Sequence, residues 1–448
     1  MDRQGRSVAD RRAYEQATIF APATVVGRAA VGIVRCSGSA VADICFRLTN
    51  RELPPPRRAT LREIHDDDGR AIDRAMLLYF AAPASFTGED ILEIHHHGGP
   101  AIVRALLDLL IAMPACRPAE AGEFTRRAFM GGKVDLTEAE AVGDLIDATS
   151  VAQLRQAAGQ LQGALSRRLV RWSAELTHCL ALVEAEIDFS ADDDVPEGAT
   201  VALRPRIEEL IEAFDAMLVH SVAAERLRIG LTVAVTGAPN VGKSSLVNLL
   251  AGRDVAIVTA TPGTTRDVIE VALDLEGLPV TLLDTAGLRE SDDPIEREGV
   301  RRARLRAAEA DIVLIVVDRA EDLPAAPEEN SIVVQNKCDG GGDPTAGHVQ
   351  ISCLNGQGID YLLRQLHERA RTLVAGSGET ALTRLRHRAA LDAAKSHLVA
   401  FLADLYGASL DRLAEDLRLA LRSLGRITGH VEADRVLDEI FSTFCIGK

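Results

Sequence analysis

The sequence lacks an excess of positive charge. It contains 50 lysine and arginine residues against 66 aspartate and glutamate residues, which gives a net charge of −16. A protein that binds nucleic acid over most of its surface has the opposite balance, so this class is excluded, although local arginine clusters can still contact phosphates.

Cysteines are few and scattered, and long apolar runs are missing. No cysteines are spaced as C-x-x-C, which excludes a disulfide framework and a zinc ribbon. No stretch approaches the roughly 20 apolar residues of a membrane-spanning helix, and the first sixteen residues contain no apolar run typical of a signal peptide. We therefore expect a cytoplasmic protein without a membrane span. The seven cysteines are Cys36, Cys45, Cys116, Cys179, Cys338, Cys353 and Cys445.

The chain is ordinary globular protein in composition, with 47% hydrophobic and 26% charged residues. Its 448 residues suggest about three domains. Residues 1–16 are polar, and we expect a flexible tail there. Residues 17–136 mix short apolar runs with one helix-like stretch at 101–113, a pattern that predicts a small α+β domain.

Long helical periodicity follows, interrupted by an α/β pattern. Thr137 and Glu140 have the spacing of a capping box, and residues 137–226 then predict the first part of an all-α domain, with Trp172 in its core. Strands and helices alternate over residues 227–375, which predicts a mostly parallel sheet with helices on both faces. Helical periodicity returns over residues 376–448. The expected fold is thus multidomain, with an α/β domain inserted into an all-α domain.

A phosphate-binding loop is indicated by Gly237–Ser244, which fits G-x-x-x-x-G-K-[ST] between a strand and a helix. The glycines allow backbone amides to surround a phosphate, and the helix N-terminus adds positive potential. We expect Lys243 to reach the β and γ oxygens and Ser244 to coordinate Mg²⁺.

Two further motifs follow in order, each at a strand end. Asp284 precedes Thr285, Ala286 and Gly287, where a carboxylate supports Mg²⁺ and an amide meets the γ-phosphate. Asp339 in Asn336–Asp339 can accept both the N1–H and the 2-amino group of guanine, which selects GTP over ATP. Thr265, in a segment between these motifs and the loop, is expected on Mg²⁺. The expected GTP-binding residues are Asn240, Val241, Gly242, Lys243, Ser244, Ser245, Thr259, Ala260, Thr261, Pro262, Gly263, Thr264, Thr265, Asp284, Thr285, Ala286, Gly287, Asn336, Lys337, Asp339, Ser352, Cys353 and Leu354.

Leu288 follows Gly287 where Ras-type enzymes carry a water-orienting glutamine, so another group must orient the nucleophile.

The whole pattern resembles the MnmE (TrmE) family of tRNA-modifying GTPases, which belongs to the TrmE-Era-EngA-like G proteins. The likeness is carried by these motifs together with GIVRCSG, SFTGEDILEIHHHGGP, GEFTRRAFMGGKVDLTEAEAVGDLIDA and the terminal FCIGK. It implies a Ras-like G domain and an N-terminal domain that binds tetrahydrofolate.

The resemblance also implies an activity and its cofactors. Family members place an aminomethyl or carboxymethylaminomethyl group on C5 of the wobble uridine of certain tRNAs, together with the FAD-containing partner MnmG (GidA). A 5-formyl- or 5,10-methylene-tetrahydrofolate supplies the one-carbon unit, and K⁺ activates GTP hydrolysis. A homodimer through the N-terminal domain is likewise implied.

Matching positions assign roles to particular residues. Glu296 matches the glutamate that orients the attacking water, beside Lys243 in catalysis, and Cys445 in FCIGK is expected to act in tRNA modification. Folate would be held by Arg35, Glu93, Lys133 and Lys448, and K⁺ by Asn240, Thr259, Thr261 and Thr264. Pro262, the three consecutive histidines and Gly131 depart from the family pattern.

Several alternatives stay open. His95 and His97 share a strand face, but two ligands seldom make a metal site, so a structural or folate-lining role is favoured. Three arginine clusters fit either solvated helix faces or contacts to tRNA phosphate. A GTP-dependent ribosome-assembly or signalling switch is the rival function, but it leaves FCIGK unexplained. The clusters are Arg167, Arg168 and Arg171; Arg301, Arg302, Arg304 and Arg306; and Arg384, Arg386 and Arg388.

Overall fold

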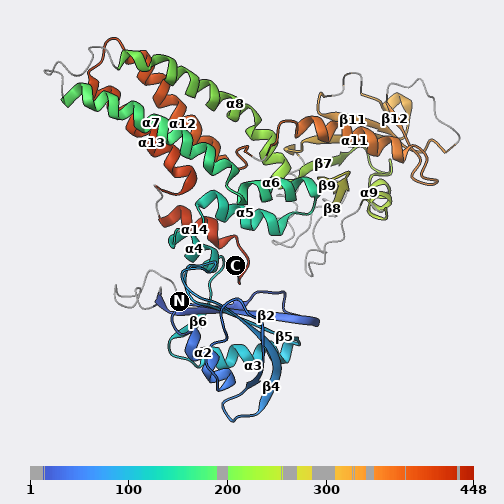
Figure 1. The fold of residues 1–448 in the computed structure, drawn as a ribbon. Coiled ribbons are helices and arrows are strands. Elements are labelled where there is room, and N and C mark those ends of the chain that lie inside the picture. Colours follow the sequence, from blue (N-terminus) through green and yellow to red (C-terminus); the bar gives the residue numbers. More distant parts are fainter. Residues whose placement is uncertain are drawn as a thin grey trace, which may run out of the picture. The chain divides into compact units, whose positions relative to one another are not determined.

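Figure 1 shows the computed structural model of the chain. The structure describes residues 14, 16–188, 200–253, 255, 270–284, 308–324, 326, 328–339, 348–378, 380–430 and 434–447. The chain divides into two compact units, one of Met1–Gly143 with Thr428–Lys448 and the other of Asp144–Ile427. The first unit is therefore assembled from two segments that lie far apart in the sequence.

A six-stranded sheet forms the body of the first unit, in the order β3-β4-β5-β2-β1-β6. Neighbouring strands are antiparallel except for the parallel pair β1 and β6. The α+β expectation for this part of the chain is confirmed. The strands are β1 (Thr18–Pro22), β2 (Ala29–Ser37), β3 (Thr60–His65), β4 (Ala71–Phe80), β5 (Ile91–Gly98) and β6 (Cys116–Pro118).

The two faces of this sheet differ because side chains alternate along each strand. Leu92 and Ile94 of β5 join a fully buried core with residues of α2 (Val41–Thr49) and α3 (Pro100–Ile111). The opposite face of β5 carries Glu93 and His95, which are only partly buried. One face of the sheet is therefore a conventional core, and the other is open to polar groups.

Three further helices belong to this unit in whole or in part: α4 (Glu123–Met130), α5 (Leu136–Asp147) and α14 (Asp434–Ser442). The capping box predicted at Thr137 and Glu140 is wrong. Asp135 caps α5 instead, because its carboxylate accepts the Glu138 amide at 2.9 Å while the Glu138 carboxylate accepts the Asp135 amide at 3.0 Å. Thr137 is buried and donates its hydroxyl to Asp135. The helix therefore begins two residues before the position that the sequence suggested.

Long helices form one part of the second unit, with a shared apolar core (Figure 1). Trp172 lies in this core, as predicted, with its ring 4.7 Å from that of Phe214. The helices come from both sides of the α/β segment, which confirms the inserted arrangement. They are α7 (Ala164–Asp188), α8 (Arg204–Ile229), α12 (Leu385–Asp404) and α13 (Leu410–Thr428), and the shorter α6 (Val151–Leu161) precedes them.

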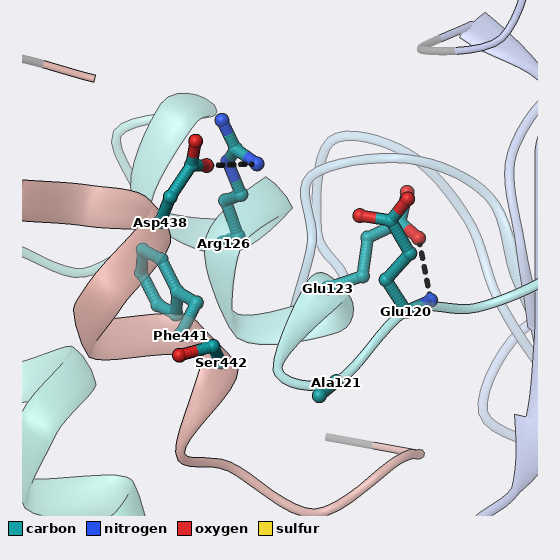
Figure 2. A pocket seen from close by; sticks show the side chains of 7 residues that line it. All are labelled: Glu120, Ala121, Glu123, Arg126, Asp438, Phe441 and Ser442. Carbon is teal, nitrogen blue, oxygen red and sulfur yellow. Dashed lines mark hydrogen bonds and ion pairs between the residues drawn. The ribbon is translucent and has the colours of Figure 1, made fainter. Parts of the chain in front are cut away.

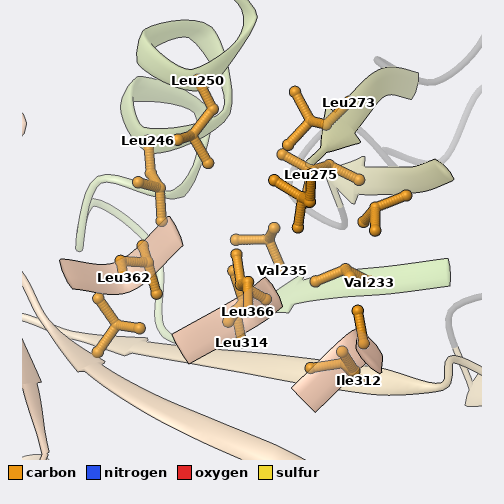
Figure 3. Packing of buried hydrophobic residues seen from close by; sticks show 14 of the residues in the cluster. Val233, Val235, Leu246, Leu250, Leu273, Leu275, Ile312, Leu314, Leu362 and Leu366 are labelled. Carbon is orange, nitrogen blue, oxygen red and sulfur yellow. The ribbon is translucent and has the colours of Figure 1, made fainter. Parts of the chain in front are cut away.

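The inserted segment forms a second six-stranded sheet in the order β12-β11-β10-β7-β9-β8, in which only the β8–β9 pair is antiparallel. The predicted, mostly parallel sheet is thus confirmed. Apolar residues of the strands pack against α9 and α11 (Figure 3). The elements are β7 (Leu231–Thr236), β8 (Glu270–Leu275), β9 (Leu278–Asp284), β10 (Ile312–Val317), β11 (Ser331–Gln335), β12 (Val349–Gln350), α9 (Lys243–Ala251) and α11 (Ile359–Leu373).

The long helix α8 leads into the central strand β7 through the single residue Gly230, whose φ is +91°. Only glycine adopts such a backbone conformation without strain. Among the described ranges, no helix is both long enough and apolar enough to cross a membrane.

Candidate functional site

The loop after β7 has the backbone shape that its glycines were expected to allow. Gly237 and Gly242 have φ values of +139° and +100°. A side chain at Gly237 would overlap the carbonyl of Val316 in β10, and one at Gly242 would overlap the amide of Asn336. Helix α9 begins at Lys243, directly after this loop. The loop therefore presents a helix N-terminus at the edge of the sheet, where an anion is favoured.

Lys243 folds back onto this loop. Its ammonium group donates hydrogen bonds of 2.8 Å to the carbonyls of both Gly237 and Ala238. The side chain is 8% exposed, so the charge is held inside the loop. A phosphate bound at the helix N-terminus would offer the ammonium a stronger, charge-assisted acceptor than these carbonyls.

Two oxygen groups suited to a hard cation meet beside the loop. The Ser244 hydroxyl, in the first turn of α9, donates to the Asp284 carboxylate at 2.7 Å. Asp284 ends strand β9 and is 1% exposed. Mg²⁺ prefers such oxygen ligands, so the two residues fit the cation that their motifs predict.

Asn336, at the end of β11, joins the phosphate loop to the residues expected around guanine. Its amide donates to the carbonyl of Val241 at 2.9 Å, and its side-chain oxygen accepts the Cys353 amide at 3.2 Å. The Ser352 hydroxyl donates to the carboxylate of Asp339. The structure thus brings three segments together: the phosphate loop, the motif Asn336–Asp339, and Ser352 and Cys353, which follow β12.

The remaining nucleotide residues are more exposed. Leu354 is 85% exposed, and Ser245 is also exposed on α9. Lys337 forms a 2.7 Å ion pair with Asp318, and this hydrogen bond lowers the pKa of the Asp318 carboxyl. Asn240 lies in the phosphate loop with a φ of +64°. The following expected residues lie outside the described residues: Thr259, Ala260, Thr261, Pro262, Gly263, Thr264, Thr265, Thr285, Ala286, Gly287, Glu296 and Lys448.

Arg35 and Glu93 face each other across β2 and β5 in the first unit. The Glu93 carboxylate accepts from the Arg35 guanidinium at 2.8 Å and 3.0 Å through one oxygen, while its other oxygen lies 3.2 Å from His95 Nε2. Lys133 lies farther along the chain, with its side chain against Gly88 of the loop before β5. The structure thus pairs Arg35 and Glu93, two of the expected folate residues.

Cys445 is exposed in a segment that lies on the first unit. Its carbonyl accepts the Gly122 amide at 3.4 Å, and the next residue, Ile446, forms an antiparallel bridge with Ala121. Burial raises the pKa of the thiols at the other six cysteine positions, 36, 45, 116, 179, 338 and 353. The structure therefore separates Cys445 from the rest by its exposure.

Two family models match the chain, the GTP-binding protein TrmE N-terminus over residues 18–133 and the MnmE helical domain over residues 136–445. The tRNA modification GTPase MnmE of Granulibacter bethesdensis is 48% identical and covers 97% of this chain and 100% of its own. The tRNA modification GTPase MnmE of Rhodospirillum rubrum is 49% identical and covers 96% of this chain and 99% of its own. The chain belongs to the MnmE family. The G domain of the T. maritima FeoB iron transporter is 27% identical over 31% of this chain and 98% of its own, with a TM-score of 0.22.

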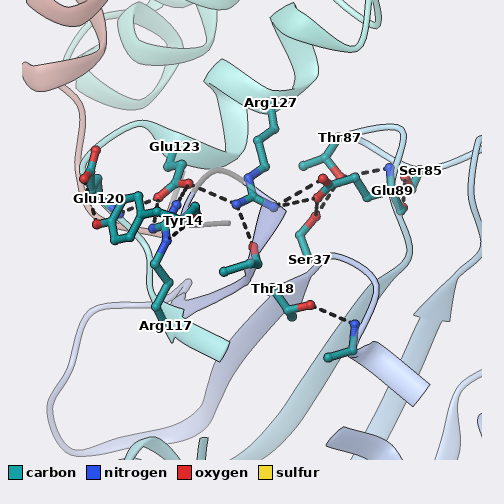
Figure 4. A network of polar contacts seen from close by, with 12 residues as sticks. Tyr14, Thr18, Ser37, Ser85, Thr87, Glu89, Arg117, Glu120, Glu123 and Arg127 are labelled. Carbon is teal, nitrogen blue, oxygen red and sulfur yellow. Dashed lines mark hydrogen bonds and ion pairs between the residues drawn. The ribbon is translucent and has the colours of Figure 1, made fainter. Parts of the chain in front are cut away.

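This MnmE-family chain also contains a partly buried polar network that sequence reasoning missed (Figure 4). Arg127 of α4 donates to Glu89 at 3.0 Å and 3.2 Å, to Glu123 at 3.1 Å and to the Ala17 carbonyl at 2.8 Å. Arg117 forms a bidentate pair with Glu123. The opposite charges in SFTGED and GEFTRR were the available signal, but their pairing depends on tertiary structure.

Beside this network lies a pocket of about 310 Å³ between α4 and α14 (Figure 2). Arg126 and Asp438 form a 3.0 Å ion pair at one side, and Glu120 and Glu123 lie at the other. Phe441 of α14 lines the pocket. The first unit of this MnmE-family chain thus contains a polar hollow next to the segment that carries Cys445.

The solvated-face interpretation is wrong for the arginine cluster at the start of α12. Arg384 donates to Asp144 at 2.8 Å, Arg386 to the carbonyl of Ile427 at 3.1 Å, and Arg388 pairs with a glutamate of α8 at 3.4 Å. These guanidinium groups hold helices together. Arg168 lies 5.3 Å from the Trp172 ring, and the cluster at 301–306 lies outside the described residues.

Proposed function

We propose that this chain hydrolyses GTP and acts in the modification of wobble uridine at C5 in certain tRNAs. The observation that carries the proposal is the meeting of the phosphate loop, the Ser244–Asp284 pair and Asn336 at one sheet edge. Full-length likeness to proteins named tRNA modification GTPase MnmE supports the tRNA part.

In the proposed reaction, the loop binds the phosphates and Lys243 shifts from its two carbonyl acceptors to the β and γ oxygens. Helix α9 directs its amide end at the same charge. Mg²⁺ would be held by Ser244 and Thr265, and it neutralises charge on the phosphates. Asp339, with Ser352 holding its carboxylate, selects guanine through two hydrogen bonds.

Hydrolysis needs a group that orients water and a positive charge near the β–γ bridge. We assign the first role to Glu296, because Leu288 has no side-chain oxygen. The second would come from K⁺ held by Asn240, Thr259, Thr261 and Thr264, a cation that supplies the electrostatic stabilisation of an arginine finger. The left-handed backbone of Asn240 lies within the phosphate loop, which suits this assignment.

The N-terminal unit would bind the folate that supplies the one-carbon group. Arg35, Glu93, Lys133 and Lys448 are the proposed ligands, with basic groups for the glutamate tail and a carboxylate for the pterin donors. The partly buried Arg35–Glu93 pair lies on the open face of the sheet, which suits a ligand with both kinds of group. A second copy of this chain, FAD on MnmG and a cytoplasmic location complete the proposal.

The test compares cells that lack the gene with cells that express this chain from a plasmid. We expect wobble nucleosides, measured by mass spectrometry, to lose the C5 modification without the chain and regain it with the chain. The purified chain should release phosphate from GTP and not from ATP. Hydrolysis with unchanged wobble nucleosides would contradict the tRNA role and favour an assembly or signalling switch.

A further inference from the structure

The segment 441–447 lies against glycines of the N-terminal unit. At Gly122, where φ is +64°, a side chain would approach the Phe441 carbonyl oxygen to 2.6 Å. Gly122 also donates its amide to Cys445. At the far end, a side chain on Gly447 would overlap the Pro22 carbonyl at the end of β1. The backbone on either side of Cys445 is therefore in close contact with the unit.

Phe444 lies in the chain between these two contacts. A methyl group at Gly143 would lie 3.2 Å from Phe444 Cζ, so the ring rests directly on that glycine. The ring also lies 5.7 Å from that of Phe441, tilted by 51°, and the Phe441 ring in turn lies 6.4 Å from that of Phe129. Cys445 itself is exposed, so its own side chain contributes little to this anchoring.

Gly143 is unusual because it lies inside helix α5. Alanine is favoured over glycine in a helix interior by about 1 kcal/mol, so helix formation does not explain the glycine. The close approach of the Phe444 ring does explain it. The helix is intrinsically less stable with a glycine at this position, and the glycine makes room for the Phe444 ring. We therefore call Gly143 the seat of Phe444, meaning the residue on which its ring packs.

We propose that Gly143 and Phe444 are positioning residues for tRNA modification. Phe444 anchors the segment and Gly143 is its seat, and together they hold Cys445 at Gly122, in a segment whose Gly447 contacts Pro22 at the end of β1. This inference rests on the proposed function and on the role in modification that the family resemblance implies for Cys445. It does not involve the nucleotide residues of the other unit.

The test uses four full-length variants: Gly143→Ala, Phe444→Leu, the double variant and the control Gly27→Ala. Gly27 has nothing within 4 Å of an added methyl group. Leucine lacks the Cζ atom that a methyl at position 143 would meet, so the double variant restores the space. The three readouts are GTP hydrolysis, wobble nucleosides in cells, and hydrogen exchange of the peptide 441–448.

We expect Gly143→Ala to hydrolyse GTP within about twofold of the wild-type rate, while modification falls by roughly 3- to 10-fold, since the ring must shift by a few tenths of an ångström and a misplacement of 1 Å can cost about 100-fold. Hydrogen exchange of the peptide 441–448 should become faster in Gly143→Ala. The double variant should recover the wild-type rates of both modification and exchange. If Gly143→Ala leaves the hydrogen exchange of the peptide unchanged, or if the double variant does not recover, Phe444 does not depend on Gly143 for its position. Faster exchange with normal modification would overturn the positioning role. If Cys445→Ser modifies tRNA normally, the positioning role is overturned because Cys445 then has no part in modification, while hydrogen exchange still decides whether Phe444 packs on Gly143.

Discussion

Lys243 shows how a phosphate loop stabilises its charged residue before a ligand arrives. Two carbonyls of the loop hold the ammonium at 2.8 Å while the side chain is almost wholly buried. A buried charge without acceptors would cost several kcal/mol, so these bonds keep the site folded. In the proposed reaction, GTP would exchange one set of acceptors for another, and the lysine would need no new desolvation.

Asp339 provides a prediction about the base. If its carboxylate accepts the two donors of guanine, as proposed, Asp339→Asn should weaken GTP binding by roughly 10- to 100-fold, the range for a lost charged hydrogen bond. The asparagine amide should instead favour xanthosine triphosphate, whose 2-oxo group accepts a hydrogen bond. Competition binding with both nucleotides measures the change. Unaltered GTP affinity would remove Asp339 from the base pocket.

Asn240 provides a prediction about the monovalent cation. If it helps to hold K⁺, hydrolysis should be at least ~10-fold faster in KCl than in NaCl at equal ionic strength, because transition-state charge is stabilised only when the cation fits. Asn240→Ala should lose this difference while it still binds GTP. Phosphate release in the two salts measures it, and equal wild-type rates would defeat the assignment.

At the scale of elements, the Arg117–Glu123 pair joins β6 to α4. Burial alone would raise the pKa of Glu123, but hydrogen bonds from Arg117 and the Glu120 amide outweigh burial and hold it below the ordinary value of 4.5. A carboxyl with a depressed pKa stabilises the fold above its ordinary pKa, and this contribution is lost as the pH falls through the folded-state pKa. The ion pair between β6 and α4 is therefore weakened at acidic pH.

Glu123→Gln should reduce the dependence of the free energy of unfolding on pH in the acidic range. The wild-type chain should lose unfolding free energy steeply as the pH falls below 4.5, whereas the glutamine variant should be less stable at pH 7 and lose less below it. Urea denaturation of the full chain at several pH values measures both slopes. The exposed Glu52→Gln is the control, and it should follow the wild type. A Glu123→Gln slope equal to that of the wild type would show that this carboxyl does not carry the dependence.

How far the sequence could predict elements depends on how local their causes are. The phosphate loop was predictable because Gly237, Gly242 and Lys243 act within eight residues of chain. The start of α5 was assigned to Thr137 because two capping patterns overlap there, and only the geometry of Asp135 decides between them. Arg384 was unpredictable because its partner Asp144 lies 240 residues away. Periodicity indicates which face of a helix is apolar and does not identify what covers it.

At the scale of the whole molecule, the two proposed activities lie in separate units. The nucleotide residues belong to Asp144–Ile427, and Cys445 belongs with Met1–Gly143. Cys445→Ser should therefore leave GTP binding and K⁺-stimulated hydrolysis within about twofold of wild type while wobble modification is lost, since a serine hydroxyl is a far poorer nucleophile than a thiolate. Hydrolysis assays and nucleoside mass spectrometry separate the two effects. Loss of hydrolysis as well would contradict the division of labour.

The two-segment construction of the first unit has a consequence for synthesis on the ribosome. Residues 144–427 are made between its two parts, which takes on the order of 15–60 s at bacterial rates of elongation. During that time the seat at Gly143 and the contact site at Gly122 have no occupant, and Phe129 lacks its aromatic neighbour Phe441. The second six-stranded sheet and α11, by contrast, are complete once residue 373 has been made. A nascent chain therefore acquires its nucleotide-binding part before its N-terminal part is finished, and the anchoring of Phe444 is among the last steps of folding.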